Sequence, residues 1–348
     1  MAEIIALPTR PRATTGAAGQ AALVASFAHA RRGPDDVLWL KENAELLNVL
    51  ESTGQGRADL LTPYEAAFAD LPARFRFFPQ YYRFLLSIAL DLEDMGLPGD
   101  VAGPMAAQVA RAGLAQAELS DLQRAEARRL LGRRGLGHTV RDPGLDDRLR
   151  AFIARSQTFA LPNRKAAYEL THILFYLSEY GRCDPGVGPE TIRSLHFAGL
   201  VALLEHNADL LAEICIALRF ARVTPPPAWE AWVSARRQTV RMGTGAQAVL
   251  PDSYHEWLMA EWMRGLGGAA LFAGRYGPGR ISFHMPPPDG PLRDISRVLI
   301  GLGGARKGAW SRMRPHITVA LDPTAMATLA LAERSHQFEA FFSYFARA

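Results

Sequence analysis

Apolar residues recur every three or four positions along most of the chain, from about Gln20 onward. In the segment 35–52, for example, Val37, Leu40 and Leu47 fall on one face, after two aspartates placed where a helix dipole favours negative charge. This period is typical of helices with one buried face. It predicts helices over residues 35–52, 62–71, 79–94, 101–112, 118–133, 145–157, 163–180, 190–204, 206–221, 228–240, 252–264, 292–301 and 324–345.

Glycine and proline pairs separate these segments, as at 33–34, 98–99, 143–144 and 277–279. Short connections between helices of medium length favour antiparallel hairpins packed in layers. No repeat of fixed length is visible, which argues against tetratricopeptide and ankyrin arrays. The sequence therefore predicts a mainly α fold, either α/α-toroid-like or an irregular multi-helix bundle of about twelve helices.

Two parts of the chain depart from the helical period. Residues 1–18 are rich in Pro, Thr, Gly and Ala, and we predict a disordered N-terminal lead there. Residues 265–322 are rich in Pro and Gly and contain two β-like runs, Ile281–Met285 and Ile317–Leu321, which predict a small two-stranded β element. We expect a single helical domain over 19–348, with residues 265–322 as its C-terminal elaboration.

Composition narrows the class of protein. Of the 348 residues, 49% are hydrophobic and 21% are charged, which excludes collagen-like, coiled-coil, wholly disordered and disulfide-scaffold proteins. The 39 basic side chains are interleaved with 35 acidic ones, so binding to nucleic acid would release few counterions. Nucleic acid is therefore not an expected partner.

The cysteines and the N-terminal residues indicate the cellular compartment of the protein. Cys183 and Cys215 have no metal-type spacing, and two lone thiols fit a reducing compartment. The first residues contain an acid, Glu3, and only a short apolar run, unlike a secretory signal peptide. Apolar stretches such as Phe84–Leu90 and Phe197–Leu204 fall far short of the ~18 residues of a spanning helix. We expect a cytoplasmic protein with no membrane span.

The most informative stretch for chemistry is YELTHILFYLSEYG, residues 168–181. His172 has a tyrosine one turn before it and another, Tyr176, one turn after it, while the opposite face is apolar. Tyrosine hydroxyls and an imidazole can orient a ligand in a cavity. We consider His172 a candidate general base whose tautomer is fixed by Glu169. The alternative is an ordinary amphipathic helix whose polar tips meet water or a carbonyl.

Two further stretches carry acids and a histidine. In EHNADLLAEICI, Asp209 and Glu213 lie one helical turn apart, and they are candidate acid partners or metal ligands. The alternative is the solvated face of a surface helix. In YHEWLMAEW, His255 stands near a helix start, where the dipole favours a neutral imidazole that can act as ligand or base. The alternative is a surface histidine before a core helix.

These residues support two hypotheses about function. In the first, the protein is an enzyme or binds a small-molecule ligand, and it uses acid/base chemistry or a divalent metal; two histidines with a carboxylate suit Fe(II), Zn or Mn. In the second, it is a non-enzymatic helical scaffold or regulator that binds a partner protein through its N-terminus, the loop 286–291 or the phenylalanines of 338–345. The sequence contains no nucleophile-elbow, Walker A, dinucleotide, H-E-x-x-H or C-x-x-C motif to decide between them. The first hypothesis places a central cavity lined by His172, Tyr176, Asp209, Glu213 and His255.

Three segments resemble the recurring motifs of an uncharacterised family of bacterial all-helical proteins with a domain of unknown function. They are YELTH with FYLSEYG in 168–181, DLLAEI at 209–214 and YHEWLM at 254–259. The resemblance extends through most of the chain beyond residue 20 and implies an all-helical fold, with no established activity. The residues it marks are Glu169, Thr171, His172, Asp209, Glu213 and His255.

Overall fold

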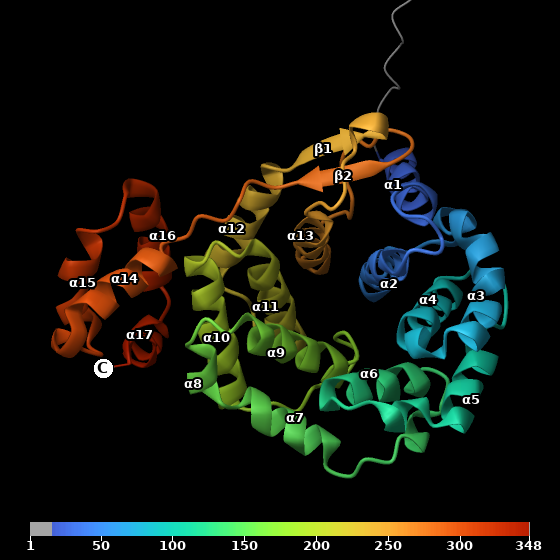
Figure 1. Cartoon of the computed structure of the whole chain (residues 1–348), viewed down its shortest axis with the longest axis horizontal. Coiled ribbons are helices and arrows are strands. Elements are labelled where there is room, and N and C mark those ends of the chain that lie inside the picture. The colour runs from blue at the N-terminus through green and yellow to red at the C-terminus, as the bar shows by residue number, and fades with distance from the viewer. Residues whose placement is uncertain (1–15, 348) are drawn as a thin grey trace, which may run out of the picture. The chain divides into compact units, whose positions relative to one another are not determined.

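The computed structural model describes residues 16–347. This part of the chain forms 17 α-helices and one two-stranded antiparallel sheet, so the predicted mainly α fold is confirmed (Figure 1). Among the described residues, we find no helix long and apolar enough to cross a membrane. Most of the predicted lead, residues 1–15, lies outside the described residues, and the first helix begins at Ala17.

The chain divides into two compact units. The first comprises the described residues up to Val101, with Arg241–Tyr254 and Ala269–His284; the second comprises Ala102–Val240, His255–Gly268 and the described residues from Met285 onward. The single domain and the toroid-like arrangement stay predictions. The elements of the first unit are α1 (Ala17–Ala25), α2 (Val37–Ser52), α3 (Glu65–Phe77), α4 (Tyr82–Asp94), β1 (Arg241–Thr244) and β2 (Ile281–His284).

The first unit is built on the contact between α2 and α4. Helix α2 begins as predicted because the Asp36 side chain accepts the backbone N–H of Leu38 at 2.8 Å, which satisfies one of the free donors at a helix start. Leu47 of α2 and Leu86 of α4 are completely buried. Strand β1 pairs with β2 in the register that places Arg241 opposite His284.

A buried arginine joins the later segments of the first unit to its N-terminal helices. The Arg31 Nε donates to Glu42 Oε2 at 2.7 Å, and its two amino groups donate to the two Asp252 oxygens at 2.9 Å each. Asp252 Oδ2 also accepts the backbone N–H of Phe283 in β2 at 2.7 Å. Because Arg31 and Asp252 are 221 residues apart, no local pattern in the sequence indicates this network. The guanidinium is further enclosed by the rings of Phe27, Tyr254 and Phe283.

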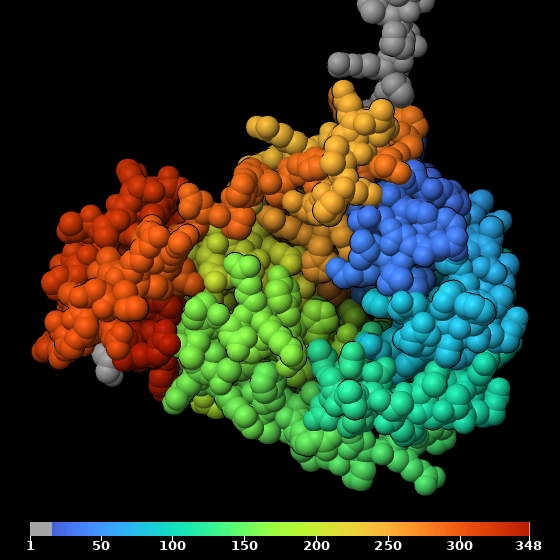
Figure 2. Space-filling view, in the orientation of Figure 1, coloured from blue at the N-terminus to red at the C-terminus, as the bar shows by residue number. Residues whose placement is uncertain are grey.

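The second unit is entirely helical in its described residues. Most residues of α10 (Pro189–Leu204) and α11 (Ala208–Phe220) are apolar and buried, so these two helices lie in the interior of the unit. Helices α14–α17 pack into one close cluster of atoms (Figure 2). The helices of the second unit are α5 (Ala102–Ala112), α6 (Asp121–Gly132), α7 (Leu145–Ile153), α8 (Ser156–Phe159), α9 (Arg164–Leu177), α10 (Pro189–Leu204), α11 (Ala208–Phe220), α12 (Pro227–Gln238), α13 (Tyr254–Leu266), α14 (Leu292–Leu302), α15 (Trp310–Thr318), α16 (Pro323–Glu333) and α17 (Phe338–Ala346). The first residue of α13, Tyr254, belongs to the first unit.

The sequence pattern located most helices but not every boundary. The helices predicted over 145–157 and 324–345 are each divided in two, as α7 with α8 and α16 with α17. Helices α1 and α15 were not predicted. In both divided segments the apolar period continues across a short turn, so the pattern alone gives one helix where the backbone forms two.

One predicted strand is confirmed and the other is wrong. Ile281–His284 forms β2, but its partner is Arg241–Thr244, and 317–321 contains the end of α15 and the turn after it. The β-branched residues near Ile317 suggested a strand. Ile317 is nevertheless buried on the same helical face as Trp310 and Met313, and this packing overrides the local propensity.

The C-terminal phenylalanines proposed as an exposed partner-binding face are buried, so that expectation is wrong. Phe338 and Phe342 pack edge-on against Trp310, with ring centroids 5.0 and 4.7 Å away. Phe341 contacts Phe197 of α10 at 6.0 Å. These rings form the core of the α14–α17 cluster, which removes one of the three candidate surfaces of the scaffold hypothesis.

We expect His196 of α10 to make the second unit sensitive to acid. Burial, with a smaller contribution from the charge of His336, lowers the pKa of His196 to about 4. An unfolded histidine takes up a proton near pH 6.5, whereas the folded one resists protonation until about pH 4. The stability contributed by neutral His196 is therefore complete above pH 6.5 and is lost as the pH falls toward 4.

We expect this group to reduce the free energy of unfolding by about 3 kcal/mol across that interval. Urea denaturation at several pH values measures the effect. The His196→Leu variant should flatten the pH dependence, whereas His138→Gln, at an exposed position, should leave it unchanged. Equal slopes in wild type and His196→Leu would show that other groups cause the acid sensitivity.

Candidate functional site

Three helices of the second unit, α9, α11 and α13, carry the predicted site residues. Two asparagine caps determine where α9 and α11 begin: Asn163 accepts the N–H of Ala166 at 3.2 Å, and Asn207 accepts the N–H of Leu210 at 3.1 Å. The caps therefore help to fix which side chains of α9 face α11. The residues that meet are Tyr168, Thr171 and His172 of α9, Asp209 and Glu213 of α11, and His255 of α13.

Each carboxylate of α11 accepts a hydrogen bond from a hydroxyl of α9. Tyr168 donates to Asp209 Oδ2 at 2.7 Å, and Thr171 donates to Glu213 Oε2 at 2.6 Å. Burial and the charge of Asp209 raise the pKa of Tyr168, so its phenol stays protonated and remains a donor. The Nδ1 of His255 lies 2.7 Å from Asp209 Oδ1. Asp209 thus connects all three helices.

The second carboxylate, Glu213, is in an apolar environment with only 1% of its side chain exposed. Burial raises the pKa of Glu213, and the negative charge of Asp209 raises it further. His172, His255 and the Thr171 hydroxyl act in the opposite direction. A carboxylate in this setting is stabilised by a nearby positive charge, which a proton, an imidazolium or a metal ion can supply.

His172 has a defined tautomer. Its Nδ1 lies 2.8 Å from the Tyr168 carbonyl oxygen, which can only accept, so Nδ1 carries the proton and a neutral ring presents the lone pair of Nε2. The carboxylate of Glu213 lies beside the His172 ring, with Oε2 3.7 Å from Nδ1. No hydrogen bond or ion pair joins His172 to Glu169 among the residues described. The ring is 36% exposed and meets Tyr176 edge-on at 6.1 Å.

Asp209, Glu213 and His255 form a group that can hold a metal ion. One ligand atom from each lies within 4.8 Å of the others. Two carboxylates and an imidazole provide oxygen and nitrogen donors of the kind that Mn²⁺, Fe²⁺ and Zn²⁺ accept. The alternative interpretation of the segment 205–216, a solvated face of a surface helix, does not hold for Asp209 and Glu213. Glu213 is buried, and Asp209 faces α9 and α13.

Other polar residues of the same segments lie outside this group. Glu205 Oε2 pairs with Arg164 at 3.3 Å, and Glu256 Oε1 pairs with Arg236 at 3.0 Å. Because an arginine already compensates the charge of each of these two glutamates, neither needs a metal ion. The ring of Tyr176 contacts His172 edge-on, with ring centroids 6.1 Å apart.

Tyr168 and Thr171 were not among the site residues predicted from the sequence. Tyr168 stands one helical turn before His172, and this spacing could have indicated that both side chains share a helix face. Thr171 was marked only by the family resemblance. Their acceptors are 41 and 42 residues further along the chain. A hydrogen bond over that separation follows from helix packing and not from any local spacing.

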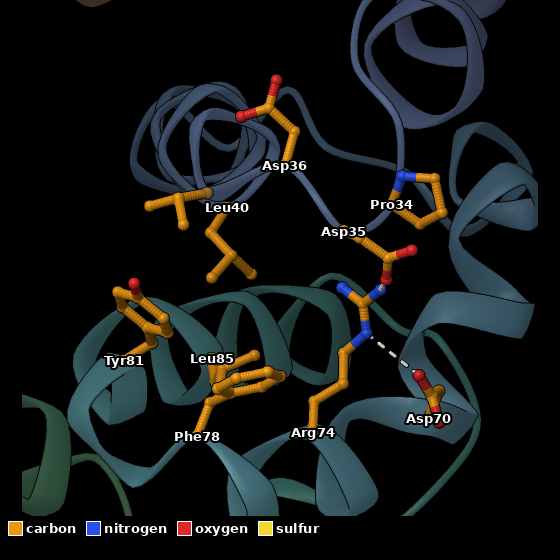
Figure 3. Close-up of a pocket in the computed structure, with 10 residues that line it drawn as sticks. Pro34, Asp35, Asp36, Leu40, Asp70, Arg74, Phe78, Tyr81 and Leu85 are labelled. Atoms are coloured by element: carbon orange, nitrogen blue, oxygen red, sulfur yellow. Dashed lines mark hydrogen bonds and ion pairs between the residues drawn. The ribbon is translucent and has the colours of Figure 1, made fainter.

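The first unit contains a separate pocket of about 360 Å³ (Figure 3). Arg74, which lines this pocket, pairs with two aspartates of the same lining, Asp70 at 2.9 Å and Asp35 at 3.5 Å. Phe78 and Tyr81 supply aromatic wall, with ring centroids 6.2 Å apart. None of the predicted site residues lines this pocket, and its arginine is paired with two of the three aspartates of the lining.

Comparison with known proteins yields a family and no closer relative. Neither the curated proteins nor the solved structures include a match to this chain. The family described as "Domain of unknown function (DUF6902)" matches residues 1–348, the whole chain. This confirms the expectation of a family without an assigned function. The chain belongs to the DUF6902 family.

Proposed function

We propose that this protein is a metal-dependent enzyme acting on a small molecule, with Asp209, Glu213 and His255 as ligands of one divalent metal ion. The observation that supports this most strongly is the convergence of their ligand atoms within 4.8 Å, from helices that are not adjacent in the sequence. The ion would polarise a bound water or substrate oxygen. Mn²⁺, Fe²⁺ and Zn²⁺ match the donor set.

The charge balance of the site favours a cation. Two carboxylates stand close together, one of them buried, and the histidines nearby are only partly exposed. Burying a carboxylate beside another is costly unless positive charge compensates it. A divalent ion bound by Asp209 and Glu213 offsets both charges at once.

The surrounding residues have distinct roles in this proposal. Tyr168 and Thr171 hold the two carboxylates in place by hydrogen bonds, as outer partners of metal ligands commonly do. His172 presents Nε2 as a general base, because its Nδ1 is occupied by the Tyr168 carbonyl. Glu169 has no part in orienting it.

The metal content of the purified protein tests the proposal. We expect wild-type protein, prepared without a metal-affinity tag, to carry close to one divalent ion per chain by plasma mass spectrometry. His255→Ala should lose the ion, whereas Glu205→Gln, an acidic residue on the same segment but outside the ligand group, should keep it. A wild-type protein that carries no metal and takes up none on dialysis against Zn²⁺ or Mn²⁺ contradicts the proposal.

We also infer that the protein acts in the cytoplasm, that it is bacterial, and that its helices form one toroid-like domain. The free thiols of Cys183 and Cys215 support a reducing compartment. The many medium-length helices support the toroid-like arrangement.

A further inference from the structure

Arg129 of α6 is a buried arginine for which the described part of the chain supplies no counter-ion. Its residue surface is 7% exposed, and its Nε has no hydrogen-bond partner among the described residues. Within that part of the chain the guanidinium makes no ion pair. It stacks instead over the ring of Tyr180 at 4.5 Å and lies 5.9 Å from the ring of Tyr176.

This arrangement differs from those of the other buried charges. Arg31 is buried against Glu42 and Asp252, and the buried Glu261 pairs with Arg237 and Arg264. An arginine cannot release its proton in a protein, so burial leaves the charge of Arg129 in place. Cation–π contacts compensate part of the lost hydration, but they leave the buried Nε–H donor of Arg129 without an acceptor among the described residues.

Arg129 lines a pocket of about 320 Å³ in the second unit. Two more arginines line it: Arg128, which pairs with Asp146, and Arg150, whose Nε donates to the Pro185 carbonyl at 3.1 Å. The acidic residues of the lining are Asp146, already paired, and the exposed Glu179. Three arginines against two acids give the lining a net positive charge, and neither Arg129 nor Arg150 makes an ion pair among the described residues.

We propose that this pocket binds a small oxyanion, a carboxylate or phosphate group, which supplies the missing counter-charge of Arg129. The planar guanidinium presents paired N–H donors that match two oxygens of either group. The Tyr176 ring contacts both Arg129 and His172, so the pocket lies one aromatic ring away from the proposed general base. The inference rests on the charge of Arg129 and does not depend on the metal proposal.

Isothermal titration calorimetry of the metal-free full chain tests the anion site. Sodium phosphate and sodium succinate are titrated separately, against sodium chloride of equal ionic strength. We expect wild type to bind at least one of the two oxyanions, and the tighter one identifies the ligand group. Arg129→Met should bind it at least about tenfold more weakly, whereas Arg193→Gln, an exposed arginine of the same unit, should bind it as wild type does.

Thermal unfolding in chloride buffer provides an independent measurement. Since Arg129→Met removes an uncompensated charge, its melting temperature without oxyanion should equal or exceed that of wild type, and phosphate or succinate should no longer raise it. If Arg129→Met does not fold, Arg150→Gln tests the same pocket and should also weaken the oxyanion. The proposal is overturned if wild type binds neither oxyanion, or if the variants bind as tightly as wild type.

Discussion

Asp252→Asn is expected to lower the free energy of unfolding by about 3–5 kcal/mol, the cost of leaving a buried charge without its partner. Both Asp252 oxygens accept from Arg31, and Oδ2 also accepts the N–H of Phe283. Glu42, the other partner of Arg31, is shared with Arg32, so it cannot compensate for the loss. Urea denaturation of the full chain, followed by circular dichroism, measures the change.

A matched ion pair on the surface provides the control. Arg57 and Asp59 make the same two-pronged contact, with both distances 2.9 Å, but their side chains are 49% and 67% exposed. Water screens such a pair, so Asp59→Asn should leave the unfolding free energy unchanged within error. Equal losses for Asp252→Asn and Asp59→Asn would show that burial of the Arg31 network does not determine its contribution.

Glu213→Gln is expected to separate metal binding from stability. The amide keeps an oxygen that can accept from Thr171, but it removes the buried negative charge beside Asp209. We expect the affinity for a divalent ion to fall by at least about 100-fold, or about 2.7 kcal/mol. In the absence of metal the variant should resist urea as well as wild type or better, because burial disfavours the carboxylate that it lacks.

Metal titrations and urea denaturation of the same two proteins give both quantities. A purely structural role for Glu213 predicts a different outcome, in which the variant unfolds more readily and binds metal as before. Such a result would assign the acidic pair to packing and remove it from the site.

The helices were predictable because their apolar period is a local property of the chain. Strand β1 was not, since Arg241–Thr244 has mostly exposed side chains and no alternation of burial. It becomes a strand only because β2 lies beside it, although the two are separated by about 40 residues in the sequence. Ile317 shows the reverse error, in which β-branched residues suggested a strand and packing produced a helix.

The candidate site was predicted in its residue types but not in its contacts. The four-residue spacing of Asp209 and Glu213 placed both on one helix face, and this local rule was sufficient to select them. The hydroxyls that bind them and the tautomer of His172 depend on how α9 packs on α11. The burial of Arg129 could not be predicted from the sequence, because an arginine in a helix rich in charged residues is usually exposed.

The number of divalent ions bound per chain shows whether Asp209, Glu213 and His255 form a metal centre. Metal-free wild type and an Asp209→Asn/His255→Ala double variant are titrated with Mn²⁺, observed by the electron paramagnetic resonance signal of the free ion, and with Zn²⁺ by calorimetry. We expect wild type to bind one ion tightly and the folded double variant not to bind it. Wild type that binds neither metal, or a double variant that binds as many ions as wild type, would contradict a metal centre at Asp209, Glu213 and His255.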